Sequence, residues 1–334
     1  MPLISVIVPT LRVGGLDILF AGLEQQTFKD FELVLVDCLW NKRQSIVAEK
    51  ASQYHFPIRH VEPRDNPFPL NSYQRCVNTG LVNASGPISY FTCDYSWLPP
   101  GCLQEHADFH QARGPNHAML GVCHLLGLPL VSPGFPARYG LCELGMGRGV
   151  PKPDVLAKWD DDTIRHSATR EWCDSYCQDL SSGLLDRYMW SIFEKPFQSN
   201  DNPLHLPIIH EEMKKSKPEG FIEPQFCHLK NDSIPTELLL LVNGFDERYD
   251  GSHGWQDSEV SDRLFMRLGT QWYLKPTNIV HITDVHDLMI IRKMLRSERA
   301  NEQLYLTGHA TGYADPVNPE LDIRGMRLQT ISAR

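Results

Sequence analysis

Short apolar segments alternate with helical patterns over the first hundred residues, and this alternation limits the possible folds more than any other feature. Leu3–Val8 and Phe31–Val36 are rich in aliphatic and β-branched residues, which is typical of strands buried on both faces of a parallel sheet. Strands at 58–61 and 88–91 and helices at 16–26, 43–54 and 71–82 complete the pattern. Such repeats form right-handed crossovers, so we predict an α/β fold with a mostly parallel central sheet flanked by helices.

Beyond Pro99 and Pro100 the alternation is lost. Gly and Pro are frequent between 121 and 153, which is typical of loops and short strands. The other predicted elements are helices at 102–111, 160–179, 184–193 and 288–306, strands at 226–230, 271–274 and 278–282, a helix or strand at 236–242, and a polar tail at 308–334. The second half is therefore expected to be rich in loops and to end in a helix and a tail.

Composition excludes several classes of protein. The formal charge of −9 over 334 residues argues against binding of nucleic acid through a broad basic face. No apolar run reaches the roughly 18 residues of a membrane-spanning helix, and residues 2–9 lack the basic region and cleavage site of a signal peptide. The nine cysteines include no CxxC pair, which indicates reduced thiols in a cytoplasmic protein.

Polar residues follow three of the predicted strands. Pro9, Thr10 and Arg12 come after the first strand, and Asp37 ends the second. Residues 92–96, Thr-Cys-Asp-Tyr-Ser, follow the fourth strand. Ligands of open α/β sheets bind beyond the carboxyl ends of the strands. We therefore expect these residues to line one binding site.

Residues 243–264 combine turn formers, aromatic residues and carboxylates, and then take up helical spacing. Val260 and Leu264 belong to the apolar side of a helix that begins close to Asp257. The unpaired amides at a helix N-terminus favour an acidic residue. Asp257 is therefore either a helix cap or part of a functional site.

Four segments together resemble the family 2 glycosyltransferases, which have the GT-A fold. Residues 5–10 are similar to the opening strand of the family, and residues 25–37 to its second strand with the acidic residue that ends it. Residues 76–86 resemble its Arg-Asn helix, and residues 243–257 its GGFDE and WGWED motifs. The resemblance covers residues 3–264, weakly at 114–223. It implies a Rossmann-like GT-A fold and transfer of a sugar from a nucleotide sugar with inversion.

On this resemblance, the donor binds at the strand ends. Asp37 matches the acid that contacts the nucleobase or ribose, and Asn78 matches the asparagine of the helical motif, whose arginine is replaced in this chain. Pro9, Thr10 and Arg12 are expected to line the same pocket. The expected donor is a UDP-, GDP- or dTDP-sugar.

The resemblance also implies a divalent cation. Asp94 stands where the family has its metal-binding DXD motif, as a single carboxylate. Because Mg²⁺ and Mn²⁺ prefer oxygen ligands and keep waters, one carboxylate with diphosphate oxygens is chemically sufficient. His281, or alternatively His286, is the second expected ligand, and Mn²⁺ or Mg²⁺ the expected cofactor. The alternatives are that Asp94 caps a turn and that the histidines are packing residues; the acidic run 160–162 is interpreted as N-terminal helix charge.

On the same resemblance, the residues that bind and activate the acceptor lie at the end of residues 243–257. Asp257 matches the carboxylate that takes the proton of the acceptor hydroxyl as general base. Gln256 replaces the preceding acid and retains the capacity to hydrogen-bond an acceptor. Trp255 either offers a flat surface to a sugar ring or fills the core. The acceptor is expected to be a glycan, and nucleic acid is not expected.

These expectations divide the chain into a GT-A domain at 1–290 and a terminal helix and tail at 291–334. Within the domain, residues 1–100 would bind the nucleotide sugar and residues 101–290 the acceptor. Two alternatives to a glycosyltransferase stay open. One is a sugar-1-phosphate nucleotidyltransferase, although the loop at 11–15 lacks the lysine of such enzymes. The other is a catalytically silent relative that binds nucleotide sugars.

Overall fold

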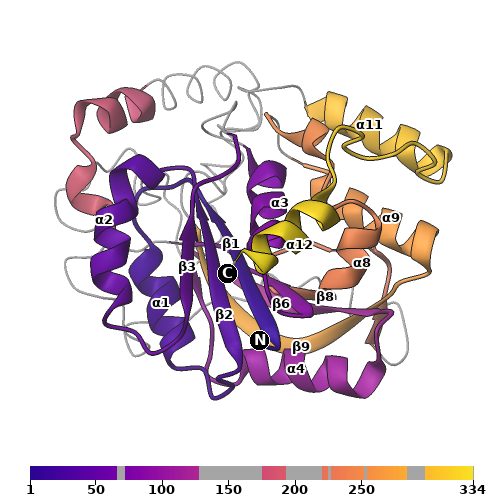
Figure 1. Cartoon of the computed structure of the whole chain (residues 1–334), viewed down its shortest axis with the longest axis horizontal. Coiled ribbons are helices and arrows are strands. Elements are labelled where there is room, and N and C mark those ends of the chain that lie inside the picture. The colour runs from indigo at the N-terminus through magenta and orange to yellow at the C-terminus, as the bar shows by residue number, and fades with distance from the viewer. Residues whose placement is uncertain are drawn as a thin grey trace, which may run out of the picture.

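The computed structural model describes residues 1–65, 72–127, 175–192, 220–224, 227–251, 254–283 and 298–333. Within these ranges the chain forms one nine-stranded sheet with helices on both faces (Figure 1). The strand order is β3-β2-β1-β4-β8-β6-β9-β5, and β7 pairs with β9. In the same ranges, no helix is both long and apolar enough to cross a membrane.

The N-terminal strands follow the sequence-based prediction. The parallel strands are β1 (Ile4–Thr10), β2 (Phe31–Asp37), β3 (Ile58–Val61) and β4 (Ile88–Phe91), and the helices between them are α1 (Leu16–Glu24), α2 (Trp40–Ala51) and α3 (Tyr73–Asn83). Successive strand residues face opposite layers of the molecule. Val6 packs in one core cluster with α1 and α4 (Cys102–Arg113), and Ile7 packs in the other with α3. Apolar residues on both faces therefore explain the continuous apolar runs.

The second half of the sheet is mixed. β8 (Asp232–Pro235) lies antiparallel between β4 and β6 (His117–Gly127), and β9 (Gln271–Thr283) runs parallel to β6. β5 (Ser96–Trp97) and β7 (Phe221–Ile222) pair antiparallel with β9. Six of the nine strands (β1, β2, β3, β4, β6 and β9) thus share one direction, and β5, β7 and β8 oppose it. The prediction of a mostly parallel sheet flanked by helices is confirmed.

Several predicted boundaries in this half were wrong. The start of the region predicted as loops and short strands belongs to β6, a long internal strand, and the strand expected at 226–230 lies instead at β8. The two late strands are a single strand, β9. The helix predicted at 184–193 is only a short 3₁₀ turn, Asp186–Tyr188.

A buried polar network explains why β8 forms a central strand without an apolar run in its sequence. Asn231, just before β8, accepts a hydrogen bond from the Tyr90 hydroxyl at 2.8 Å and donates to the backbone carbonyl of Thr277 at 2.9 Å. The Ser233 hydroxyl lies 2.7 Å from Nδ1 of His106 and 2.8 Å from Nε2 of His110. Polar side chains are tolerated in this central strand because they hydrogen-bond one another.

The C-terminal region packs against the rest of the protein. It contains α11 (Glu298–Ala310), which overlaps the helix predicted at 288–306. It also contains α12 (Ile323–Ser332), so the prediction of an irregular tail at 308–334 was wrong. α12 packs against α3, and Arg327 donates to the backbone carbonyl of Ala84 at 2.9 Å. α8 (Thr236–Leu241), the 3₁₀ turn η7 (Glu247–Tyr249) and α9 (Gln256–Leu268) connect β8 to β9. The predicted helix at 160–179 lies mostly outside the described residues.

The two buried histidines predict a pH-dependent contribution to stability. Burial lowers the pKa of His106 to about 3 and that of His110 to about 4, against about 6.5 in an unfolded chain. Below pH 6.5 the unfolded state therefore binds protons that the folded state does not bind. The free energy of unfolding decreases as the pH is lowered. In His106→Gln, the free energy of unfolding should fall less between pH 6.5 and 5 than in the wild type, by roughly 2 kcal/mol. Urea unfolding at both pH values measures this difference, and equal pH dependence would contradict it.

Candidate active site at the strand ends and the start of α9

The carboxyl ends of β1, β2 and β4 meet, as the sequence predicted for parallel strands. Thr10 pairs in register with Asp37 on the neighbouring strand. The Thr10 hydroxyl donates to Asp94 Oδ2 at 2.8 Å, and its oxygen accepts from Arg43 at 3.0 Å. Three of the expected site residues are thereby joined through one hydroxyl and one arginine that the sequence had not singled out.

Asp37 is wholly buried and engaged by the protein itself. Arg43 donates to its two oxygens at 2.5 Å and 3.0 Å, His60 Nε2 lies 2.9 Å away, and the Leu39 amide donates at 2.7 Å. Burial alone would raise the pKa of Asp37, but the charge of Arg43 and the hydrogen bond to His60 outweigh it and hold the pKa below its ordinary value. Asp37 is therefore an ionised anchor for Arg43. No side-chain oxygen of it is exposed.

Asp94 forms the second ion pair of this region. The guanidinium of Arg12 contacts its Oδ1, which also accepts from the Tyr95 amide at 3.1 Å. The same guanidinium lies 4.0 Å from the centre of the Tyr95 ring. With Thr10 on Oδ2, both oxygens of this buried carboxylate are occupied. Arg12 and Arg43 together balance the charges of Asp37 and Asp94.

The expected metal ligands lie in this neighbourhood without forming a cation site. His281 is buried on β9 opposite Ser96 of β5, and its Nδ1 lies 3.3 Å from the Ser96 hydroxyl. His286 and residues 160–162 lie outside the described residues. Among the residues that are described, no group of three His, Cys, Asp or Glu side chains is arranged to hold a metal ion. Arg12, Thr10 and the Tyr95 amide engage both oxygens of Asp94. The cation expected at Asp94 stays a prediction.

A cavity of about 490 Å³ opens at the ends of β2 and β3. Its size falls within the range of ligand pockets in proteins. The Trp40 ring lies at its wall, 4.4 Å from the ring of His60. Charged side chains also line it, namely Lys42, Glu62, Arg64 and Asp65. The sequence pattern pointed to this end of the sheet but not to these side chains, which lie outside the matched motifs.

Asn78 holds the segment that leads to α9. Its Nδ2 donates to the Phe245 carbonyl at 2.9 Å and to Glu247 at 3.0 Å, and its Oδ1 accepts from the Phe245 amide at 2.8 Å. A Cβ added to Gly244, whose φ is +72°, would lie 2.4 Å from Asn78 Oδ1. The amide of Asn78 is thus fully used in fixing residues 244–247. Its expected contact with the donor stays a prediction.

Asp257 lies in the first turn of α9 and does not cap it. The N-cap residue is Trp255, and no side chain makes a capping hydrogen bond there. Asp257 Oδ1 and Gln256 Oε1 are both buried, and neither has a hydrogen-bond partner among the described residues. Burial, helped by the charge of Asp232 and opposed by that of Lys230, raises the pKa of Asp257 to about 7. Asp257 is therefore suited to accept and release a proton near neutral pH.

Trp255 is half buried and packs against the C-terminal region. Its ring stacks on Tyr305 of α11 at a centroid distance of 4.9 Å and an interplanar angle of 27°. Its φ of +70° is unusual for a residue with a side chain. One side of Trp255 is thereby occupied by the protein, and a role in acceptor binding stays a prediction.

No model of a protein family matches the sequence, and no curated protein matches it either. Solved structures do resemble the fold. S. aureus TarS, residues 1–349 in complex with UDP-GlcNAc, has a TM-score of 0.52 and 13% identity over 99% of this chain and 72% of that chain. Two further structures have lower TM-scores. The Pyrobaculum calidifontis mannosyltransferase PcManGT with GDP-Man and Mn²⁺ has a TM-score of 0.47 and 14% identity over 99% of this chain and 74% of that chain. GalNAc-T7 with UDP, GalNAc and Mn²⁺ has a TM-score of 0.49 and 11% identity over 98% of this chain and 54% of that chain. The likeness to TarS confirms the predicted GT-A type of fold.

The buried ion pair of Arg43 predicts a large effect on stability. In Arg43→Met, Asp37 keeps its burial and loses its main partner, so the free energy of unfolding should fall by about 3–5 kcal/mol. Lys42→Met is the matched control, because Lys42 makes an exposed pair with Asp186 at 3.1 Å, and its loss should be below about 1 kcal/mol. Equal losses in urea unfolding would show that burial of the Arg43 pair does not matter.

Proposed function

We propose that this protein transfers a sugar from a nucleotide-diphosphate sugar to an acceptor hydroxyl with inversion at the anomeric carbon. The observation that carries the proposal is the carboxylate of Asp257, with a buried oxygen that has no partner and a pKa of about 7, in a chain with a GT-A type of fold. A general base needs such a pKa to take a proton near neutral pH.

The cavity at the ends of β2 and β3 suits the nucleoside of the donor. Its volume of about 490 Å³ is sufficient for a nucleoside, and the Trp40 ring offers a flat apolar surface to a base. Since the oxygens of Asp37 are taken by Arg43 and His60, Asp37 would act by holding this wall in place. TarS is known with UDP-GlcNAc bound, which makes uridine nucleotides the first to test among UDP-, GDP- and dTDP-sugars.

The departing diphosphate needs positive charge, and Arg12 is the basic group beside Asp94. Mn²⁺ or Mg²⁺ at Asp94 and His281 stays a prediction from the sequence, and no step is derived through it. In the proposed arrangement Asp94 orients Arg12, and the guanidinium meets the diphosphate oxygens. Such charge-assisted hydrogen bonds are strong because the arginine is already held in place.

On the acceptor side, Asp257 would take the proton of the attacking hydroxyl while Gln256 orients the acceptor through its free amide oxygen. Asp257 as a single base would give direct displacement, as the resemblance implies. Attack from the side opposite to the leaving diphosphate inverts the anomeric carbon. A glycan hydroxyl is the expected acceptor, with Trp255 beside it.

The loop after β1 disfavours a sugar-1-phosphate nucleotidyltransferase. Such an enzyme would need the glycines of this loop to admit phosphate oxygens to the backbone. A Cβ at Gly15 would lie 2.7 Å from the Tyr95 ring, and one at Gly14 would lie 2.4 Å from Ile192. These glycines therefore allow close packing of side chains. The turnover measurement described below distinguishes a glycosyltransferase from a catalytically silent relative that only binds nucleotide sugars.

Asp257→Asn tests the base. The variant is isosteric, so transfer from a panel of UDP-, GDP- and dTDP-sugars should fall by roughly 10²–10⁴-fold, with donor affinity changed less than about twofold. In the wild type kcat/KM should rise with pH through about 7, because only deprotonated Asp257 accepts a proton. This rise should be absent from the residual activity of the variant. Full activity in Asp257→Asn would assign the base elsewhere, and tight nucleotide binding without any turnover by the wild type would identify a silent relative.

Arg12→Met tests the diphosphate contact. The affinity for UDP, measured by calorimetry, should fall about 10- to 100-fold, since a hydrogen bond to a charged group is worth roughly 1.5–3 kcal/mol. The affinity for uridine should hardly change, because uridine has no phosphate. Wild-type binding of UDP should persist in EDTA. If UDP binds only when Mn²⁺ or Mg²⁺ is added, the cation of the sequence-based prediction takes the role proposed for Arg12.

A further inference from the structure

One face of α11, in the C-terminal region, is directed at the beginning of α9. Asn301, Tyr305 and His309 follow one another at intervals of four residues, which puts them on one side of a helix. Each contacts a residue of α9 or of the loop before it. α11 and α9 contact each other and lie on the same side of the molecule in Figure 1.

Asn301 holds the loop that precedes α9. The residue is fully buried, and its Nδ2 donates to the Gly254 carbonyl at 3.1 Å and more weakly to the Tyr249 carbonyl at 3.4 Å. Gly254 has a φ of +99°, so the chain turns sharply where the amide binds it. The position of this turn sets the direction in which α9 begins.

Tyr305 and His309 hold α9 on either side of Asp257. The Tyr305 ring stacks on Trp255, two residues before Asp257. His309 Nδ1 lies 2.6 Å from Oδ2 of Asp262, five residues after Asp257, and the Tyr313 hydroxyl donates to the same oxygen at 2.9 Å. The left-handed backbone of Trp255 is unfavourable for a residue with a side chain, and the stack on Tyr305 helps to hold it.

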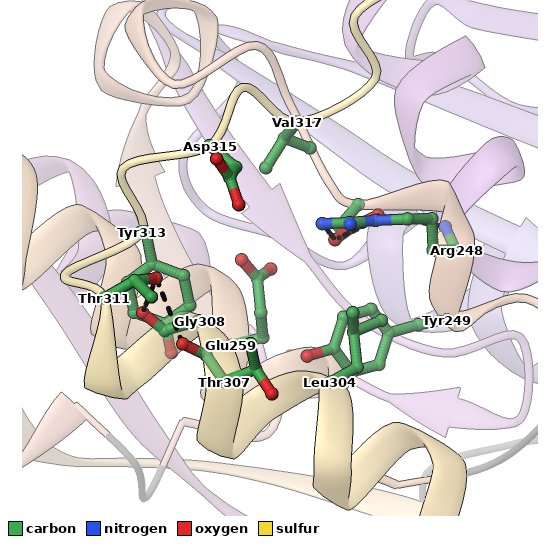
Figure 2. Close-up of a pocket in the computed structure, with 11 residues that line it drawn as sticks. Arg248, Tyr249, Glu259, Leu304, Thr307, Gly308, Thr311, Tyr313, Asp315 and Val317 are labelled. Carbon is green, nitrogen blue, oxygen red and sulfur yellow. Dashed lines mark hydrogen bonds and ion pairs between the residues drawn. The ribbon is translucent and has the colours of Figure 1, made fainter.

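The interface between these helices contains a small cavity. Figure 2 shows it between η7, α9 and α11, with Glu259, Tyr249 and Thr307 in its wall. Its volume is about 40 Å³, enough for a water molecule, and the buried Tyr249 hydroxyl has no hydrogen-bond partner among the described residues. The hold of α11 on α9 therefore depends on a few specific contacts, which single substitutions can remove.

We propose that α11 positions the acceptor base, and that Asn301 and Tyr305 are positioning residues for Asp257. The inference rests on the proposed role of Asp257 and extends it to a part of the chain outside the resemblance. Neither residue touches the reacting atoms; they keep Gly254 and Trp255, and with them the carboxylate, in place. A displacement of about 1 Å at a reacting group can cost about 10²-fold in rate.

The test compares four variants of the full chain. Asn301→Asp keeps the size of the side chain but replaces its donor by an oxygen that repels the Gly254 carbonyl, and Tyr305→Leu removes the ring. Tyr305→Phe is the conservative variant that keeps the ring. Glu302→Gln lies on the exposed face of α11 and is the control. Each is measured by hydrogen exchange of residues 254–262, by calorimetric binding of UDP, and by the kcat of transfer.

We expect amides 254–262 to exchange at least tenfold faster in Asn301→Asp and Tyr305→Leu, and kcat to fall about 10- to 100-fold, while UDP affinity and exchange in β1 and β2 stay unchanged. Tyr305→Phe and Glu302→Gln should behave like the wild type. Unchanged exchange at 254–262 in both disruptive variants, or a parallel loss of UDP affinity, would overturn the positioning role. Faster exchange at 254–262 together with a wild type that transfers no sugar would instead refute the proposed function and leave the contact of α11 with α9 established.

Discussion

The buried guanidinium of Arg43 is the interaction on which the donor side depends. It neutralises Asp37, bonds the Thr10 hydroxyl and donates to the Arg12 carbonyl at 2.8 Å. Through Thr10 it also fixes Asp94, so one side chain from α2 ties together the ends of three strands. A charge without a partner would be very costly at this depth. Removing either arginine would leave a buried carboxylate without its ion-pair partner.

In the two halves of the candidate site the pKa values of the carboxylates are shifted in opposite directions. Arg43 and His60 keep the pKa of Asp37 low, whereas burial and the neighbouring Asp232 raise the pKa of Asp257 to about 7. Carboxylates whose environments separate their pKa values commonly have different roles. One is a permanently charged support for the strand ends, and the other is free to exchange a proton. α11, which contacts the start of α9, belongs structurally to the second half.

Much of the fold followed from local pattern, and the exceptions have physical reasons. β1 and β2 were predicted because they carry apolar residues on both faces, so their pattern needs no knowledge of neighbours. β8 was missed because Asp232 and Ser233 are poor strand formers. Asp232 accepts hydrogen bonds from the His228 and Leu229 amides, and the Ser233 hydroxyl bonds His106 and His110. The tail was predicted as irregular because its polar residues hide α12, which packs on α3 more than two hundred residues earlier.

The sequence by itself determined the order of β1 to β4 and of the helices between them, the residues at the strand ends, and the acidic residue near the start of α9. These depend on chemical type and spacing within a short stretch of chain. Only the tertiary structure decided which partner each of those residues has: Arg12 for Asp94, Arg43 for Asp37, and, among the described residues, none for one oxygen of Asp257. Hydrogen bonds, ion pairs and pKa values depend on distance and burial. Residues as far apart as Arg12 and Asp94 acquire these only when the sheet has formed.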